Sequence, residues 1–115
     1  DRKITVPYDP FFSCINAHFS GQYFGASLSA LEELAEEKGY YFIGCNSAGN
    51  NAYFLKNKYK SIIGPKAVKK GFVSGKYRDD RDINGELVFS SRVSCINAIR
   101  GMPVFNIQNN KIEEF

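Results

Sequence analysis

The stretch from Gln22 to Lys56 constrains the fold more than any other part of the chain, because it encodes three consecutive elements. Residues 27–38 repeat leucine and alanine at helical spacing, with glutamate and lysine on the other face, which predicts an amphipathic helix. Gly39 supplies the left-handed residue that commonly ends a helix. Residues 40–43 and 52–55 are short and rich in aromatic and aliphatic side chains, which predicts two antiparallel strands joined by a polar loop.

The rest of the chain is predicted to add short elements around this helix and hairpin. The Asn-Gly pair at 84–85 is a strong signal for a tight turn followed by a strand. Val93, Ile96 and Ile99 recur at helical spacing and predict a second helix. Gly101 then ends that helix. The elements expected in chain order are a strand at 4–6, an ordered aromatic loop at 13–25, a short helix at 65–70, an exposed charged segment at 76–82, a strand at 86–90, a helix at 91–100 and a closing hairpin of strands 104–107 and 111–115.

Length and composition indicate a single domain, residues 1–115. No apolar run approaches the roughly 20 residues of a membrane helix, so we expect no membrane partner. Three widely spaced cysteines without a Cys-x-x-Cys pair suit free thiols in a reducing, cytoplasmic compartment and predict no metal site. The chain begins without methionine and enters strand-like sequence at once, so we expect it to be a fragment of a larger protein.

The net charge of +3 is unevenly distributed. Residues 56–82 carry nine basic and three acidic groups, whereas residues 1–55 carry three basic and six acidic groups. A basic segment with interspersed aromatic residues is one feature of nucleic-acid-binding surfaces. However, its positive electrostatic potential is partly cancelled by three acidic residues, Asp79, Asp80 and Asp82. No nucleic-acid recognition motif accompanies the segment. A solvated charged face is therefore the favoured interpretation, and nucleic acid is not an expected partner.

The loop between the two predicted strands, residues 45–51, is rich in amide and hydroxyl side chains. Such groups can hydrogen-bond a carbohydrate or another polar ligand. Alternatively, asparagine and glycine supply only the backbone conformations of a hairpin loop. The loop is longer than the about two to five residues of most hairpin connections, so a ligand-binding role stays open. The candidate substrate-binding residues in the loop are Asn46, Ser47, Asn50 and Asn51.

Cys14 and His18 are four residues apart and would meet on a helix, which suggests a thiol–imidazole pair. The aromatic, glycine-interrupted sequence around them argues against a helix, so a structural role is favoured. Neither a dinucleotide-binding fingerprint nor a phosphate-binding loop is present. The residues therefore predict no cofactor-binding site in this chain, and catalytic residues stay unknown.

Three strings occur in an order that resembles a known family: ITVPYDP, YFGASLSALEELAEEKGYYFIGCNSAGNNAYFL and GMPVFN. They are similar to the C-terminal half of FkbM-like, S-adenosylmethionine-dependent methyltransferase-like proteins, which often accompany surface-polysaccharide biosynthesis. The resemblance implies an α/β fold in which this chain is the last part of a Rossmann-like sheet, and an α+β piece by itself. Residues 27–38 would form the last crossover helix, 40–44 the sixth strand and 52–56 the antiparallel seventh strand.

The same resemblance implies that the methyl donor binds to earlier strands outside this chain, so the chain alone is expected to be inactive. It places the loop 45–51 at the carboxyl edge of the sheet, where acceptor substrates bind. His18 and Tyr23 could border the same edge. No catalytic residue is carried over, because no catalytic motif of the family falls within these positions.

A second hypothesis is a non-catalytic binding or oligomerisation module. The resemblance implies that residues 52–55 lie between residues 40–43 and an earlier strand outside this chain, so the outer edge of 52–55 would be exposed. Residues 52–55 have no charge or proline to keep another chain from pairing with this edge. Tyr53 and Phe54 would lie exposed beside it. Either the C-terminal strands 104–107 or 111–115 fold back to cover this edge, or two copies of the chain pair through it. We favour the homodimer, because the two strands of the closing hairpin already pair with each other.

Overall fold

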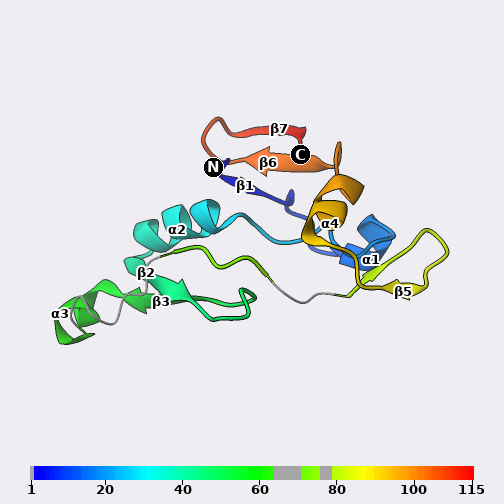
Figure 1. Ribbon diagram of the computed structural model, residues 1–115. Coiled ribbons are helices and arrows are strands. Elements are labelled where there is room, and N and C mark those ends of the chain that lie inside the picture. The colour runs from blue at the N-terminus through cyan, green and yellow to red at the C-terminus, as the bar shows by residue number, and fades with distance from the viewer. Residues whose placement is uncertain (1, 64–70, 76–78) are drawn as a thin grey trace. The chain divides into compact units, whose positions relative to one another are not determined.

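The computed structural model describes residues 2–63, 71–75 and 79–115, and the predicted helix at 65–70 lies outside these residues. The chain forms two compact units, which are described separately. We call residues 28–76 the hairpin unit, and residues 1–27 with 77–115 the sheet unit. Both combine helices with antiparallel strands, so the fold is of the α+β kind (Figure 1).

The hairpin unit contains the predicted amphipathic helix and the predicted hairpin. Gly39, with a φ of 76°, separates the helix from the first strand, and its carbonyl accepts a hydrogen bond from the N–H of Asn57 at 2.9 Å. The helix packs against this strand. The elements are α2 (Leu28–Glu37), β2 (Tyr40–Cys45), β3 (Ala52–Lys56), the 3-10 turn η1 (Asn57–Tyr59) and α3 (Lys60–Ile63).

The two strands of the hairpin pair in an antiparallel register with one irregularity. Phe42 lies opposite Phe54, with their ring centroids 5.5 Å apart, whereas Gly44 lies opposite Tyr53. One extra residue, Ile43, is therefore accommodated on β2, as in a β-bulge. Gly44 is buried and has a φ of 139°, a conformation that favours glycine.

The sheet unit is built from segments at both ends of the chain. Its main sheet has the order β1-β6-β7 with antiparallel pairs, and β4 and β5 form a second, two-stranded sheet. The closing hairpin expected from the sequence is therefore present as β6 and β7. The elements are β1 (Ile4–Thr5), α1 (Cys14–Ala17), β4 (Asp80–Arg81), β5 (Leu87–Val88), α4 (Arg92–Ala98), β6 (Pro103–Asn106) and β7 (Lys111–Glu114).

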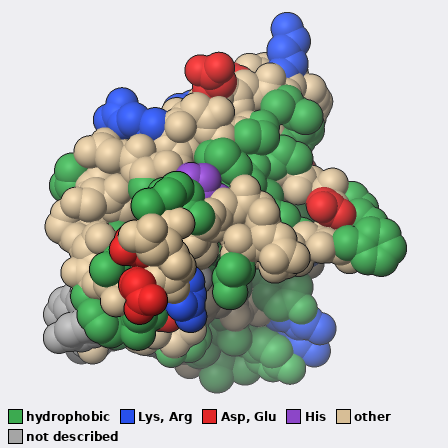
Figure 2. Space-filling model, turned by 90° about the vertical axis from the view of Figure 1, so that its right-hand side faces the viewer, with side chains coloured by type: hydrophobic (Ala, Val, Ile, Leu, Met, Phe, Trp, Pro, Cys, Tyr) green, Lys and Arg blue, Asp and Glu red, His purple; other side chains and the backbone are tan. Residues whose placement is uncertain are grey.

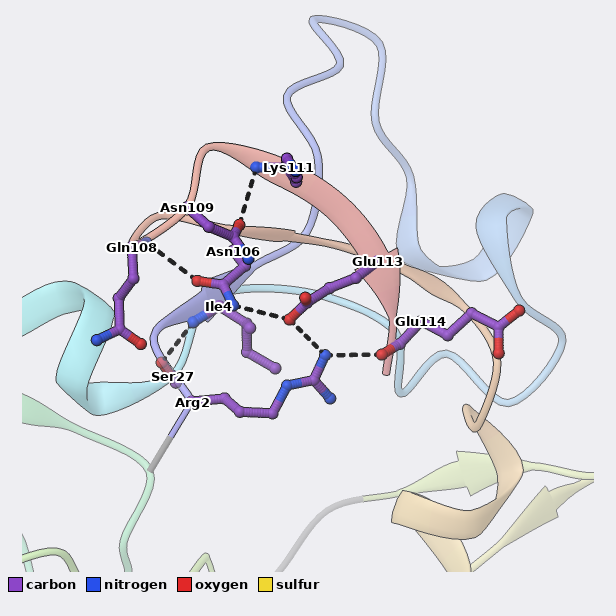
Figure 3. A network of polar contacts seen from close by, with 9 residues as sticks. All are labelled: Arg2, Ile4, Ser27, Asn106, Gln108, Asn109, Lys111, Glu113 and Glu114. Atoms are coloured by element: carbon purple, nitrogen blue, oxygen red, sulfur yellow. Dashed lines mark hydrogen bonds and ion pairs between the residues drawn. The ribbon is translucent and has the colours of Figure 1, made fainter.

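A polar network ties the N-terminal segment to the hairpin of β6 and β7 (Figure 3). Arg2 Nη2 donates to Glu113 Oε1 and to the carbonyl of Glu114, both at 2.7 Å. Asn106 Nδ2 donates to the same Glu113 oxygen at 2.8 Å, and Asn106 Oδ1 accepts the N–H of Gln108 at 3.0 Å. The hydrogen bonds from Arg2 and Asn106 lower the pKa of Glu113 below its ordinary value of 4.5.

The apolar core of the sheet unit is small. Tyr23 and Val104 are its buried hydrophobic residues among those described. The ring of Phe12 packs edge-on to that of Tyr23 at 6.1 Å between centroids. Tyr8 and Phe11 are almost fully exposed. Figure 2, viewed from the side of α1, α4 and β5, shows hydrophobic side chains at the surface in several places.

Five sequence-based expectations need correction. The segment 13–25 was expected to be a loop without a helix, but Cys14–Ala17 form the single helical turn α1. This turn is closed by two hydrogen bonds, from Ala17 N–H to the Ser13 carbonyl and from His18 N–H to the Cys14 carbonyl. Asp80 is buried rather than exposed, and its Oδ1 accepts the N–H of Ser90 at 2.8 Å, which gives the buried carboxylate a hydrogen-bond partner.

The other three corrections concern apolar side chains. Val93 begins the predicted apolar face of α4, yet it is 67% exposed, so this face is only partly covered. Phe54 is half-buried rather than exposed, because its ring packs at a tilt against the ring of Phe42 on the neighbouring strand. On α2 the buried residue is Ala30, whereas Leu31 and Leu34 are exposed.

The network around Glu113 predicts a specific pH dependence of stability. Because the folded-state pKa is lowered, the carboxylate contributes stability above its unfolded pKa, near 4.5, and loses it as the pH falls through the folded value. Glu113→Gln should flatten the decline of the free energy of unfolding below about pH 4.5. Urea denaturation across this range measures the effect. Glu114→Gln keeps every side-chain contact drawn in Figure 3 and is the control. Equal slopes for Glu113→Gln and Glu114→Gln would contradict the prediction.

Candidate functional site

The loop between β2 and β3 is organised by the side chain of Asn46. Its Oδ1 accepts the N–H groups of Asn50 at 3.1 Å and of Asn51 at 3.2 Å. Its Nδ2 donates to Asn50 Oδ1 at 2.6 Å, and its backbone N–H bonds to the carbonyl of Asn51 at 3.2 Å. The polar atoms of Asn46 are therefore engaged within the loop, which supports the turn-forming interpretation for this residue.

Gly49 fixes the loop from a second direction. Its φ is 72°, and a Cβ atom at this position would lie 2.4 Å from the carbonyl oxygen of Ser74. The backbone of residues 73–75 therefore lies directly against the loop, at a distance that only glycine allows. The loop is held by its own asparagine and by this close approach.

Ser47 and Asn51 are the candidates whose side chains stay available to a ligand. Both are exposed, and within the described part of the chain neither side chain has a hydrogen-bond partner. The Nδ2 group of the exposed Asn50 also has no acceptor there. Together these groups are neutral donors and acceptors, which suit a polar or carbohydrate ligand. They include no group that titrates near neutral pH, so they can position a ligand but supply no acid or base.

His18 lies in the sheet unit, where it shapes a turn. Its Nδ1 lies 2.8 Å from Ser20 Oγ and accepts the N–H of Ser20 at 3.3 Å. Ser20 Oγ in turn accepts the N–H of Gln22 at 3.2 Å. The imidazole is thus hydrogen-bonded to Ser20, and its link to Cys14 is a backbone bond, so the favoured structural role fits the contacts.

Tyr23 is also part of the sheet unit, and it is buried in its core. Its hydroxyl donates to the carbonyl of Pro103, and burial raises the pKa of the phenol. The hydroxyl is thus already hydrogen-bonded within the unit. The structure brings Asn46, Ser47, Asn50 and Asn51 together in one loop, and it places His18 and Tyr23 in the other unit.

Sequence patterns missed two long-range features of the structure. The approach of Ser74 to Gly49 joins positions far apart in sequence, and neither residue stands out in its local string. The network of Arg2, Asn106 and Glu113 joins positions up to 111 residues apart. Neither contact produces a recognisable pattern in the local sequence, so each is found only in the three-dimensional structure.

Comparisons with protein-family models, with curated proteins and with solved structures find no match to this chain. Among residues 2–63, 71–75 and 79–115, no group of three or more His, Cys, Asp or Glu side chains could hold a metal ion. No helix in the described part of the chain is long and apolar enough to cross a membrane. A functional interpretation therefore depends on the geometry above and on the resemblance in sequence.

The close approach at Gly49 predicts a difference between two glycine substitutions. Gly39 and Gly49 have nearly the same φ, 76° and 72°, but open space surrounds Gly39. Gly39→Ala should cost about 1–2 kcal/mol for the left-handed conformation alone. Gly49→Ala should cost at least about 1 kcal/mol more, because the methyl group meets the Ser74 carbonyl. Urea denaturation of both variants measures the difference. Equal losses of stability would show that residues 73–75 do not lie against the loop.

Proposed function

We propose that this chain is the C-terminal, acceptor-side part of an S-adenosylmethionine-dependent methyltransferase-like protein. The observation that carries the proposal is the order α2, β2, β3, in which an amphipathic helix leads into a strand with an antiparallel partner. This is the order that the resemblance implies for the last crossover helix and the last two strands of a Rossmann-like sheet. In this proposal the protein methylates a polar acceptor in surface-polysaccharide biosynthesis.

The loop 46–51 is the acceptor-side surface in this proposal. Asn46 and Gly49 hold the loop in one conformation, so binding a ligand requires little ordering of the backbone. Ser47 and Asn51 then offer exposed hydroxyl and amide groups. A carbohydrate, with its alternating donors and acceptors, is the kind of acceptor that such groups recognise.

The donor site is assigned to a segment outside this chain. The candidate loop offers neutral amides and hydroxyls without a glycine-rich turn that continues into a helix, so we place no S-adenosylmethionine site on it. A cytoplasmic location belongs to the same proposal. It is supported by Cys14, Cys45 and Cys95, all of which are free thiols.

Exposed apolar side chains support the view that other protein surfaces cover this chain. Leu31 and Leu34, one turn apart on α2, are exposed although they belong to its apolar stripe. Large exposed apolar surfaces commonly mark contacts with other parts of a protein. Within a methyltransferase-like parent, such side chains would pack against the remainder of the sheet and its helices.

The proposal is tested by methyl transfer from S-adenosylmethionine in the full-length parent protein. Asn51→Ala should raise the KM for the acceptor about tenfold, corresponding to one lost hydrogen bond, and leave the unfolding free energy within about 0.5 kcal/mol. Asn46→Ala is the matched comparison and should lower stability by about 1–2 kcal/mol, because it leaves loop N–H groups without an acceptor. Wild-type activity of Asn51→Ala would remove the loop from the acceptor site. Micromolar binding of S-adenosylmethionine to the 115-residue chain alone would show that the donor site is misplaced.

The second candidate function is assembly, and the edge of β3 favours it. In the described residues β3 pairs only with β2, and Tyr53 on β3 is 49% exposed. The C-terminal strands β6 and β7 pair with each other and with β1 rather than with β3. Residues 52–55 of β3, which precede Lys56, carry no charge, and a strand edge that is free and uncharged is a template for pairing with a second copy.

The assembly hypothesis predicts a dimer that a charge on β3 weakens. Light scattering over a concentration series should show a dimer, and Tyr53→Lys should raise its dissociation constant about tenfold or more. Tyr8→Lys places the same charge on an almost fully exposed tyrosine of the sheet unit and should leave the dimer unchanged. A monomer at all concentrations, or equal effects of both variants, would contradict pairing through β3.

A further inference from the structure

A basic and apolar surface at the end of the hairpin is not used by the proposed function. It consists of residues 56–63, which run from the last residue of β3 through η1 and α3. All eight residues are exposed, and the sequence from 56 to 78 contains no acidic residue. We call residues 56–63 the basic turn.

Each lysine of the basic turn lies over a tyrosine ring. Lys58 Nζ lies 4.8 Å from the ring centroid of Tyr59. Lys60 Nζ lies 5.4 Å from that of Tyr41, and Lys56 Nζ lies 5.8 Å from that of Tyr40. These contacts orient three long side chains that would otherwise be free to rotate. The three lysines lie within five residues of one another, at the end of β3, in η1 and at the start of α3.

The three lysines carry uncompensated charge. Among the described residues none of them has a carboxylate within 4.0 Å, and the one ion pair there joins Arg2 to Glu113. An ammonium ion over a tyrosine ring still has N–H donors for an anion. The chemistry of the basic turn therefore fits an anionic partner.

Apolar side chains beside the lysines identify which anionic partner fits. Ile62 is 76% exposed, and it follows Tyr59 by three residues and Lys58 by four, which is one turn along the chain. Ile63 is also exposed. Lysine and tyrosine beside aliphatic residues are typical of segments that lie in the headgroup region of a membrane. On such a membrane the ammonium groups would contact lipid phosphates while isoleucine would insert between the acyl chains.

A nucleic acid fits this surface less well. Bases bind to single-strand-binding proteins by stacking on aromatic ring faces. On the basic turn, a lysine occupies a face of Tyr40, Tyr41 and Tyr59. A phosphate backbone also offers no apolar group against which the exposed Ile62 side chain could pack. We therefore propose that the basic turn docks this protein on the surface of an anionic phospholipid membrane.

This inference goes beyond the proposed function and does not rest on it. It also departs from the expectation of no membrane partner, which was drawn from the lack of an apolar run long enough to span a bilayer. Docking on a surface requires no such run. It requires basic charge and a few exposed apolar side chains, both of which are present here.

The experiment is flotation of the whole 115-residue chain with lipid vesicles. Phosphatidylcholine vesicles containing phosphatidylglycerol should bind it, whereas pure phosphatidylcholine vesicles should not. Binding should weaken strongly between about 0.1 M and about 1 M salt, because the Debye length falls from roughly 10 Å to roughly 3 Å. Binding to both kinds of vesicle alike would overturn the proposal, as would binding to neither.

Two matched pairs of variants test the residues. Lys58→Gln with Lys60→Gln should weaken binding about 25-fold, at about fivefold per lysine. Arg92→Gln with Lys111→Gln removes the same charge from the sheet unit and should have no effect beyond about twofold. Ile62→Ser should weaken binding about tenfold, whereas Ile83→Ser, at a residue 77% exposed in the sheet unit, should not.

The alternative partners are separated by the same variants. Single-stranded DNA that binds with the same dependence on Lys58 and Lys60, while anionic vesicles do not bind, would assign the surface to nucleic acid and overturn the proposal. If the variants and their controls had equal effects, binding would depend only on the net charge of the protein and not on the basic turn. That result would also overturn the proposal. Methyl transfer plays no part in these measurements, so their outcome is independent of the proposed function.

Discussion

The pairing of β1 with β6 is the constraint on which the sheet unit depends. It places Ile4 opposite Asn106, and closing a loop of this length has a large entropic cost that local structure cannot offset. Arg2, Asn106 and Glu113 reinforce the pairing with charge-assisted hydrogen bonds, and Tyr23 adds the main buried ring. These few contacts bring the segments before Ser27 and after Asp79 into one unit.

The hairpin unit has a different origin of stability, because the contacts among α2, β2 and β3 are local. Gly39 reverses the chain between α2 and β2, and the loop of Asn46 and Gly49 reverses it again between β2 and β3. Each element therefore packs on its neighbour in sequence, which is the arrangement that forms at low entropic cost. The loop that connects the two strands also carries Ser47 and Asn51. The same segment of backbone therefore joins the strands and forms the candidate acceptor surface.

The two ends of this hairpin have opposite chemical character. The loop end carries neutral amides and hydroxyls, which suit a carbohydrate, and the end at Lys56–Ile63 carries lysines and exposed isoleucines, which suit a charged lipid surface. Lipid docking would hold the hairpin at a membrane while its loop stays free for a polar acceptor. Such a division of roles requires no contact between the two surfaces, and each can be tested alone.

The sequence by itself determined the elements whose contacts are local. The leucine spacing of residues 27–38, the left-handed Gly39 and the two aromatic strands predicted α2, β2 and β3, and the turn at 84–85 and the final hairpin were also found. Only the tertiary structure decided that Asn46 serves the loop while Asn51 is available, that Gly49 meets Ser74, and that Tyr23 is buried with its hydroxyl on Pro103. Asp80 and Val93 were misjudged for the same reason. Periodicity reports which side chains share a face, whereas burial and hydrogen bonding depend on partners that are distant in sequence.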